Sequence, residues 1–312
     1  MKEFCSSIIP NEVIELPELK MADVHLSIKR EDKIHPFISG NKYRKLKYNL
    51  LEAYEKKQST LLTFGGAFSN HIAAVAQAGE LGNFKTIGII RGEELRVKIP
   101  QNPTLQFANE KGMQLIFITR EEYRKKTENS FLENLKQEFG TFYIIPEGGT
   151  NELAVKGCEE ILNEEDSKFD FITTCVGTGG TIAGLINSSS EKQQILGFPA
   201  LEGAFLTKEI CKFARKENWS LVHDYSFGGY AKINTSLIEF INMFYKTTKI
   251  SLDPVYTGKM MYGILDLVNK GYFKKGTKIL AIHTGGLQGI AGMNQKLKKK
   301  NLPLIHYDKK DL

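Results

Sequence analysis

A lysine near the start of one predicted helix is the first residue whose position suggests chemistry. Asn41 is expected to cap a helix that begins there, which places Lys42 in the first turn. The positive end of the helix dipole disfavours a charged lysine, so the pKa of Lys42 should fall. A neutral amine is what Schiff-base chemistry needs, although a lone lysine in a basic helix is more often simply solvated.

A loop at the end of one predicted strand is rich in glycine and hydroxyl groups. Its members are Gly177, Thr178, Gly179, Gly180 and Thr181. It lies before a predicted helix, so successive N–H groups, two hydroxyls and the helix N-terminus could converge on a phosphate. A dinucleotide fingerprint fails only at its third glycine, where Ile182 stands, and Glu202 could contact a ribose. A nicotinamide-dependent oxidoreductase is therefore an alternative, whereas a P-loop is excluded because no Lys-Ser/Thr follows at the required offset.

The elements that must position these groups alternate between short apolar strands and longer helices. Strands are expected at 61–64, 86–90, 114–119, 142–145, 169–176, 194–201 and 278–283. Helices are expected at 69–78, 103–111, 121–138 and 152–163. This alternation predicts an α/β protein in which helices cover both faces of parallel sheets.

Composition excludes several other classes of protein. The 312 residues carry a net charge of +6, with 41% hydrophobic and 25% charged residues, as in an ordinary globular protein. No apolar run approaches the ~18 residues of a membrane span, and the N-terminus lacks a signal-peptide core, so the cytoplasm is expected. The basic runs near the C-terminus contain no interleaved aromatic residues, so nucleic-acid binding is not expected. Four scattered cysteines predict neither a metal site nor a disulfide.

Seven short motifs lie at residues 28–32, 39–45, 65–71, 145–150, 177–181, 253–259 and 283–286. Their residues and order resemble the fold-type II enzymes that use pyridoxal 5'-phosphate (PLP). The nearest branch is similar to the 1-aminocyclopropane-1-carboxylate (ACC) deaminase and D-cysteine desulfhydrase family. Because they span most of the chain and keep the family order, they are jointly specific.

The resemblance implies a fold like that of the tryptophan synthase β-subunit. Two parallel-sheet, three-layer domains would enclose a cofactor cleft. The large PLP-binding domain would comprise residues 1–44 and 156–312, and an inserted small domain would comprise residues 45–155. The resemblance also implies a homodimer that acts on a small amino acid.

The resemblance assigns roles to individual residues of the site. Lys42 would carry the cofactor and move the α-proton, Asn70 would bind the phenolate oxygen, and Thr284 would lie near the pyridine nitrogen. The 177–181 loop would bind the phosphate. Ser69, Tyr230 and Tyr256 would be catalytic, and Ser69 and Asn70, together with His71 and Thr257, would bind substrate.

Two positions distinguish the branches of this family. At the position of Thr257, ACC deaminases have Glu, whereas desulfhydrases have Thr or Ser. At the position of Thr284, ACC deaminases have Leu, whereas desulfhydrases have Thr. The resemblance thus implies α,β-elimination of D-cysteine to pyruvate, ammonia and sulfide. ACC deamination to 2-oxobutyrate and a catalytically silent ligand-binding protein are the alternatives. The chain departs from typical members at 72–74, where Ile-Ala-Ala replaces a stretch that often holds a basic residue.

Overall fold

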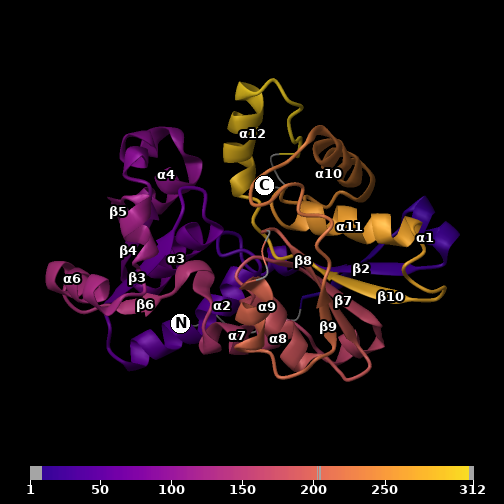
Figure 1. Cartoon of the computed structure of the whole chain (residues 1–312), viewed down its shortest axis with the longest axis horizontal. Helices are drawn as coiled ribbons and strands as arrows, with labels where there is room; N and C mark the ends of the chain where they lie inside the picture. Colours follow the sequence, from indigo (N-terminus) through magenta and orange to yellow (C-terminus); the bar gives the residue numbers. More distant parts are fainter. Residues whose placement is uncertain (1–8, 202, 204, 309–312) are drawn as a thin grey trace.

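The structure, a computed structural model, describes residues 9–201, 203 and 205–308. The chain forms two lobes, each built around its own sheet (Figure 1). The predicted α/β fold is therefore confirmed. None of the described helices is both long and apolar enough to cross a membrane. Cys158, Cys175 and Cys211 are free thiols, while Cys5 and Glu202 lie outside the described residues.

The sheet of the large domain has the strand order β1-β2-β10-β7-β8-β9. Only β1 is antiparallel to its neighbour, and the other pairs are parallel. The strands are β1 (Asn11–Ile14), β2 (His25–Lys29), β7 (Phe171–Val176), β8 (Gln194–Pro199), β9 (Trp219–Leu221) and β10 (Lys278–Ile282). Alternate residues of β10 share one apolar cluster with α8 (Gly180–Ser188) and another with α11 (Thr257–Asn269), which explains its continuous apolar sequence.

The sheet of the small domain is entirely parallel, in the order β5-β4-β3-β6. Its strands are β3 (Thr60–Gly65), β4 (Lys85–Arg91), β5 (Met113–Ile118) and β6 (Tyr143–Ile145). Helices α3 (Asn70–Gly82) and α4 (Pro103–Glu110) share one apolar cluster with this sheet. Helices α5 (Arg120–Arg124) and α6 (Asn129–Phe139) share the cluster on the opposite face.

The prediction of one helix over 121–138 was wrong, because α5 and α6 are separate. Tyr123 and Leu135 both lie in the same buried cluster. Twelve positions apart on a continuous helix they would point about 120° apart, so the break lets both side chains reach the core. A second predicted helix also ends early, since α7 (Glu152–Glu159) stops before residue 163.

The remaining elements complete the two domains. They are α1 (Pro17–Ala22), η2 (Glu31–Lys33), η3 (Glu93–Gln101), η4 (Glu147–Gly149), η5 (Glu164–Lys168), α9 (Phe205–Cys211), α10 (Thr235–Thr248) and α12 (Gly289–Lys299).

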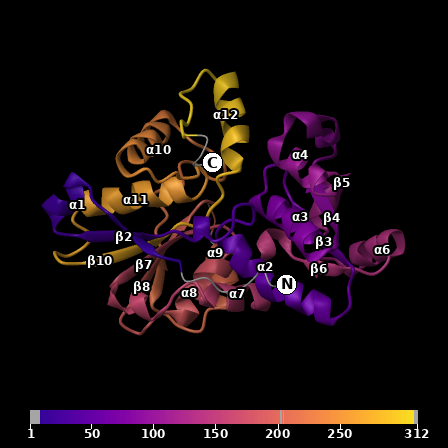
Figure 2. The same cartoon turned by 180° about the vertical axis from the view of Figure 1, so that it is seen from behind.

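The two domains are connected through helices rather than through an extended linker. Helix α2 (Asn41–Glu55) and α7 lie side by side between the lobes in both views (Figures 1 and 2). A buried pair, Arg44 Nη2 to Glu31 Oε1 at 2.9 Å, attaches α2 to the segment after β2. The predicted domain limits after residues 44 and 155 fall inside α2 and α7, and they stay a prediction.

Candidate active site

The N-cap of the helix that carries Lys42 lies one residue earlier than predicted. Gly40, not Asn41, is the N-cap of α2, and no side chain caps this end. A β-carbon on Gly40 would collide with the carbonyl of Thr284, and its φ of 62° also favours glycine. Asn41 is instead the first helical residue, and its amide donates to Thr181 Oγ1 at 2.8 Å. The start of α2 is thereby tied to both the 177–181 and the 283–286 segments.

The amine of Lys42 lies between the two domains in a setting that favours the neutral form. Its Nζ donates to Asn41 Oδ1 at 3.1 Å. Burial lowers the pKa of Lys42, and the Asp253 carboxylate only partly opposes this. The predicted direction agrees with the structure, but the main cause is desolvation rather than the helix dipole.

A second lysine on the same helix was missed by the sequence argument. Lys45 is 2% exposed, and its Nζ donates to Gly148 O at 3.1 Å, Thr150 Oγ1 at 3.0 Å and Thr178 Oγ1 at 3.4 Å. Burial, reinforced by the proximity of the Lys42 amine, lowers the pKa of Lys45 to about 7. No carboxylate forms a salt bridge with it within the described ranges. Its spacing of three residues from Lys42 places both on one helix face and could have revealed it.

The glycine-rich loop has the form of an anion cradle. Gly179 is the N-cap of α8 with a φ of +86°, which favours glycine. The Thr178 and Thr150 hydroxyl oxygens are 2.6 Å apart. A β-carbon at Gly180 would lie 2.9 Å from Thr150 Oγ1 and 3.2 Å from Lys45 Nζ, so a side chain there would crowd both groups.

These groups fit a phosphate ester. The loop supplies N–H groups at a helix N-terminus, and two threonines supply hydroxyls that can donate. Lys45 supplies a buried cation that donates to three neutral oxygens. A buried cation of this kind is best compensated by an anion.

At the opposite end of the site, residues from both domains meet. The amide of Asn70, the first residue of α3, lies over the 284–286 segment, because a β-carbon on Gly286 would be 2.6 Å from Asn70 Nδ2. Thr284 is buried, and its Oγ1 is 3.0 Å from Cys175 Sγ. Burial raises the pKa of the Cys175 thiol to about 12, so it stays neutral. The polar groups beside Thr284 Oγ1 therefore include an uncharged thiol.

Three residues predicted to be catalytic lie on exposed or half-buried segments. Ser69 caps α3 by accepting from the Ile72 N–H at 3.3 Å. Tyr256 is the N-cap of α11, and its ring would lie 3.3 Å from a β-carbon on Gly177. Tyr230 is 45% exposed, and its ring centroid is 6.2 Å from that of Tyr256. The two tyrosines thus form one group beside the glycine-rich loop.

Two predicted substrate-binding residues are buried beneath this surface. The His71 Nε2 is 2.8 Å from Thr63 Oγ1, and burial lowers the pKa of His71 well below its usual value. Thr257 is 0% exposed, and its hydroxyl donates to Asp253 Oδ1 at 2.9 Å and accepts from the Asp253 N–H at 2.8 Å. A direct contact of either residue with substrate stays a prediction.

Asp253 is a structural residue that the sequence argument named only as part of a motif. Its carboxylate accepts from the N–H groups of Val255, Tyr256 and Thr257 at 2.9, 3.1 and 2.7 Å. Burial raises its pKa, while these hydrogen bonds favour the ionised form. Asp253 therefore shapes the turn that delivers Tyr256 to the site.

Comparison with known proteins decides which cofactor this arrangement serves. A model of the family described as "Pyridoxal-phosphate dependent enzyme" matches residues 5–285. A putative ACC deaminase of Pyrococcus horikoshii is 34% identical over 299 residues, covering 88% of each chain. The chain belongs to the PLP-dependent ACC deaminase/D-cysteine desulfhydrase family. The family resemblance, the two-domain fold and the cofactor predicted from the motifs are thus confirmed.

Two further comparisons describe the range of this family. A bifunctional D-cysteine desulfhydrase/ACC deaminase of Arabidopsis thaliana is 32% identical, covering 85% of this chain and 73% of that protein. The crystal structure of an ACC deaminase homologue superposes with a TM-score of 0.81 at 31% identity, covering 94% of both chains. The chain is therefore a PLP-dependent enzyme of the deaminase/lyase type. The nicotinamide-dependent oxidoreductase and the catalytically silent protein are both rejected.

Proposed function

We propose that this enzyme is a D-cysteine desulfhydrase, converting D-cysteine and water to pyruvate, ammonia and hydrogen sulfide. One observation carries the choice of reaction. The Thr284 hydroxyl lies beside the neutral Cys175 thiol. The family resemblance implies that the pyridine nitrogen of bound PLP would lie near this hydroxyl. A hydroxyl stabilises a protonated ring nitrogen less than a carboxylate does, so a long-lived carbanion is disfavoured. Elimination avoids such a carbanion, because the electron pair at the α-carbon expels the leaving group from the β-carbon.

The protein's own residues divide the work of this reaction. When bound, PLP withdraws electrons from the α-carbon of an amino acid. Lys42 would bind the cofactor covalently and, as a neutral amine, take the α-proton at Nζ. Lys45 and residues 177–181 would bind the phosphate, and Asn70 would orient the ring from the small domain.

The substrate would be held by the more exposed residues. Ser69 would bind the carboxylate at the N-terminus of α3, where the helix dipole favours an anion. Tyr230 and Tyr256 would contact the side chain of the amino acid. His71 and Thr257 would also bind substrate, from positions held by their hydrogen bonds to Thr63 and Asp253.

ACC deamination is the second candidate. It is supported by the names of the relatives, since the Pyrococcus horikoshii protein is described as a putative ACC deaminase and the Arabidopsis thaliana protein as bifunctional. Thr257 and Thr284 favour the desulfhydrase, because the family resemblance associates Glu and Leu at these positions with ACC deaminases.

The experiment compares products from purified holoenzyme. We expect sulfide and pyruvate in equal amounts from D-cysteine, at a rate well above 2-oxobutyrate release from ACC. L-cysteine serves as the stereochemical control. Faster turnover of ACC would replace the first candidate with the second. Turnover of neither compound by protein with bound PLP would overturn both.

The homodimer implied by the resemblance is proposed in the same way, as are the cytoplasmic location and the domain limits after residues 44 and 155. Light scattering of the holoenzyme should give twice the 35.2 kDa mass of one chain. A mass of one chain at assay concentration would contradict the dimer.

A further inference from the structure

We propose that Lys259 is a positioning residue that holds Tyr230 in place for substrate through the backbone of the loop before it. This inference rests on the proposed contact between Tyr230 and substrate. Lys259 is 2% exposed, and its Nζ contacts the backbone of that loop.

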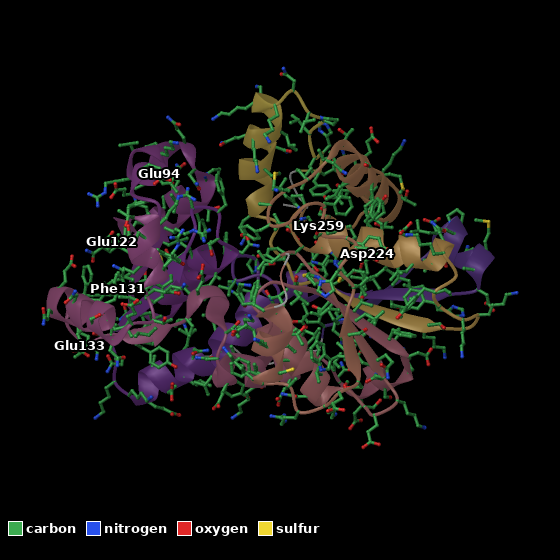
Figure 3. The ribbon with its side chains drawn as sticks, in the orientation of Figure 1. Glu94, Glu122, Phe131, Glu133, Asp224 and Lys259 are labelled. Carbon is green, nitrogen blue, oxygen red and sulfur yellow. The ribbon has the colours of Figure 1, made fainter. Side chains whose placement is uncertain are left out.

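The ammonium group of Lys259 connects helix α11 to this loop. It lies in the first turn of α11 (Figure 3), and its Nζ donates to Ser226 O at 2.6 Å and to Gly229 O at 2.8 Å. Both carbonyls belong to residues 226–231, the segment that carries Tyr230. Hydrogen bonds from a charged donor are the stronger kind, and burial removes competing water.

The backbone of residues 226–231 needs such support. Four of its residues have φ values in the left-handed region: Phe227 at 53°, Gly228 at 83°, Gly229 at 106° and Ala231 at 54°. The left-handed region is strained for a residue other than glycine. A segment of this kind persists only where surrounding contacts determine it. The two bonds from Lys259 are such contacts.

One rigid element thereby positions both tyrosines of the site. Tyr256 is the N-cap of α11, and Lys259 follows three residues later in the same helix. The two tyrosine rings meet edge to face at 65°, with their centroids 6.2 Å apart. Any shift of the 226–231 loop relative to α11 would separate the pair. A misplacement of about 1 Å can reduce catalysis about a hundredfold.

The first test compares Lys259→Met with Lys270→Met in the holoenzyme. Lys270 lies at the other end of α11, where its side chain is 64% exposed and pairs with Asp266 at 2.7 Å. In Lys259→Met we expect amide exchange in residues 226–231 to rise at least about tenfold. We expect kcat/KM to fall about ten- to a hundredfold, chiefly through KM, while the cofactor absorbance stays unchanged. Lys270→Met should resemble the natural protein in all three.

A double-mutant cycle separates positioning from general damage. If Lys259 acts through Tyr230, Lys259→Met combined with Tyr230→Phe should lose no more kcat/KM than the worse single variant. Losses that multiply, or unchanged exchange in residues 226–231, would overturn the proposal.

A second variant keeps the proposal testable if Lys259→Met fails to fold. A β-carbon at Gly229 meets nothing within 4 Å, so Gly229→Ala disturbs only the φ of 106°. We expect it to raise KM about tenfold. Gly276→Ala, at a φ of 79° with equally open surroundings, should lose similar stability without the rise in KM. Equal KM values in the two variants would contradict the inference.

The amide-exchange measurement does not depend on the reaction catalysed. If neither D-cysteine nor ACC is a substrate, the proposed function fails, yet faster exchange in Lys259→Met would still support the hold of Lys259 on the loop. If D-cysteine is turned over but the two lysine variants behave alike, only the positioning role fails.

Discussion

The cofactor side and the substrate side of this site are built in different ways. On the cofactor side, Lys45 and Thr178 are bonded to one another and to the segment after β6. On the substrate side, Tyr230 is 45% exposed and stands on a loop of unfavourable backbone angles. The cofactor can be identified from the cofactor side, whose residues are joined by several hydrogen bonds. The sparsely bonded side is where substrate preference can change by a few substitutions.

The largest expected effect is on the cofactor side. Lys42→Ala should abolish covalent attachment of PLP and reduce turnover at least about a thousandfold, because both the bond to the cofactor and the proton acceptor are lost. Mass spectrometry after borohydride reduction should find the label on Lys42 in the natural protein and none in the variant. A label on Lys45 instead would exchange the roles of the two lysines.

The next effect concerns the phosphate. Lys45→Met should weaken PLP binding about ten- to a hundredfold, as expected for loss of a hydrogen bond from a charged donor of about 1.5–3 kcal/mol. Attachment through Lys42 should persist at saturating PLP, as followed by cofactor absorbance. Lys47→Met is a suitable control, because Lys47 lies on the same helix but pairs with Glu160 at 2.6 Å. Equal PLP affinity in the two variants would remove Lys45 from the phosphate site.

The affinity for the phosphate group should depend on pH because of Lys45. The pKa of Lys45 is depressed to about 7 without an anion, so above that pH the folded protein must take up a proton to bind phosphate. A phosphate ester has its second pKa near 6, so it is already almost fully doubly ionised at pH 7. Affinity of cofactor-free protein for pyridoxine 5'-phosphate, which lacks the aldehyde, should fall up to about fivefold between pH 7 and pH 8. Calorimetric titration should show that the affinity of Lys45→Met depends less on pH than that of the natural protein. An equal pH dependence in the two proteins would refute Lys45 as its cause.

The smallest effect is expected on the substrate side. Thr257→Glu combined with Thr284→Leu should shift the ratio of the D-cysteine and ACC rates about tenfold toward ACC. Thr257→Glu also removes the bonds to Asp253, so thermal unfolding of each single variant must be followed as a control. An unchanged ratio with PLP still bound would refute the use of these positions to distinguish the branches.

The sequence predicted more about the cofactor side than about the substrate side. Lys42 and residues 177–181 belong to motifs whose residue types are dictated by imine and phosphate chemistry, so they could be named in advance. Lys45 was missed because it is one of several basic residues in the same short stretch, and only tertiary burial distinguishes it. The cap at Gly40 was missed because its reason is a distant carbonyl, that of Thr284. The split between α5 and α6 likewise depends on a core that the local pattern does not show.

The bonds of Lys45 cross from one sheet to the other, since Gly148 follows β6 and Thr178 follows β7. A ligand that strengthens this cross-link also fastens the lobes to each other. Occupancy should then govern how the molecule melts, with a single cooperative heat-absorption peak when the cofactor is present and two separable peaks once it is stripped away.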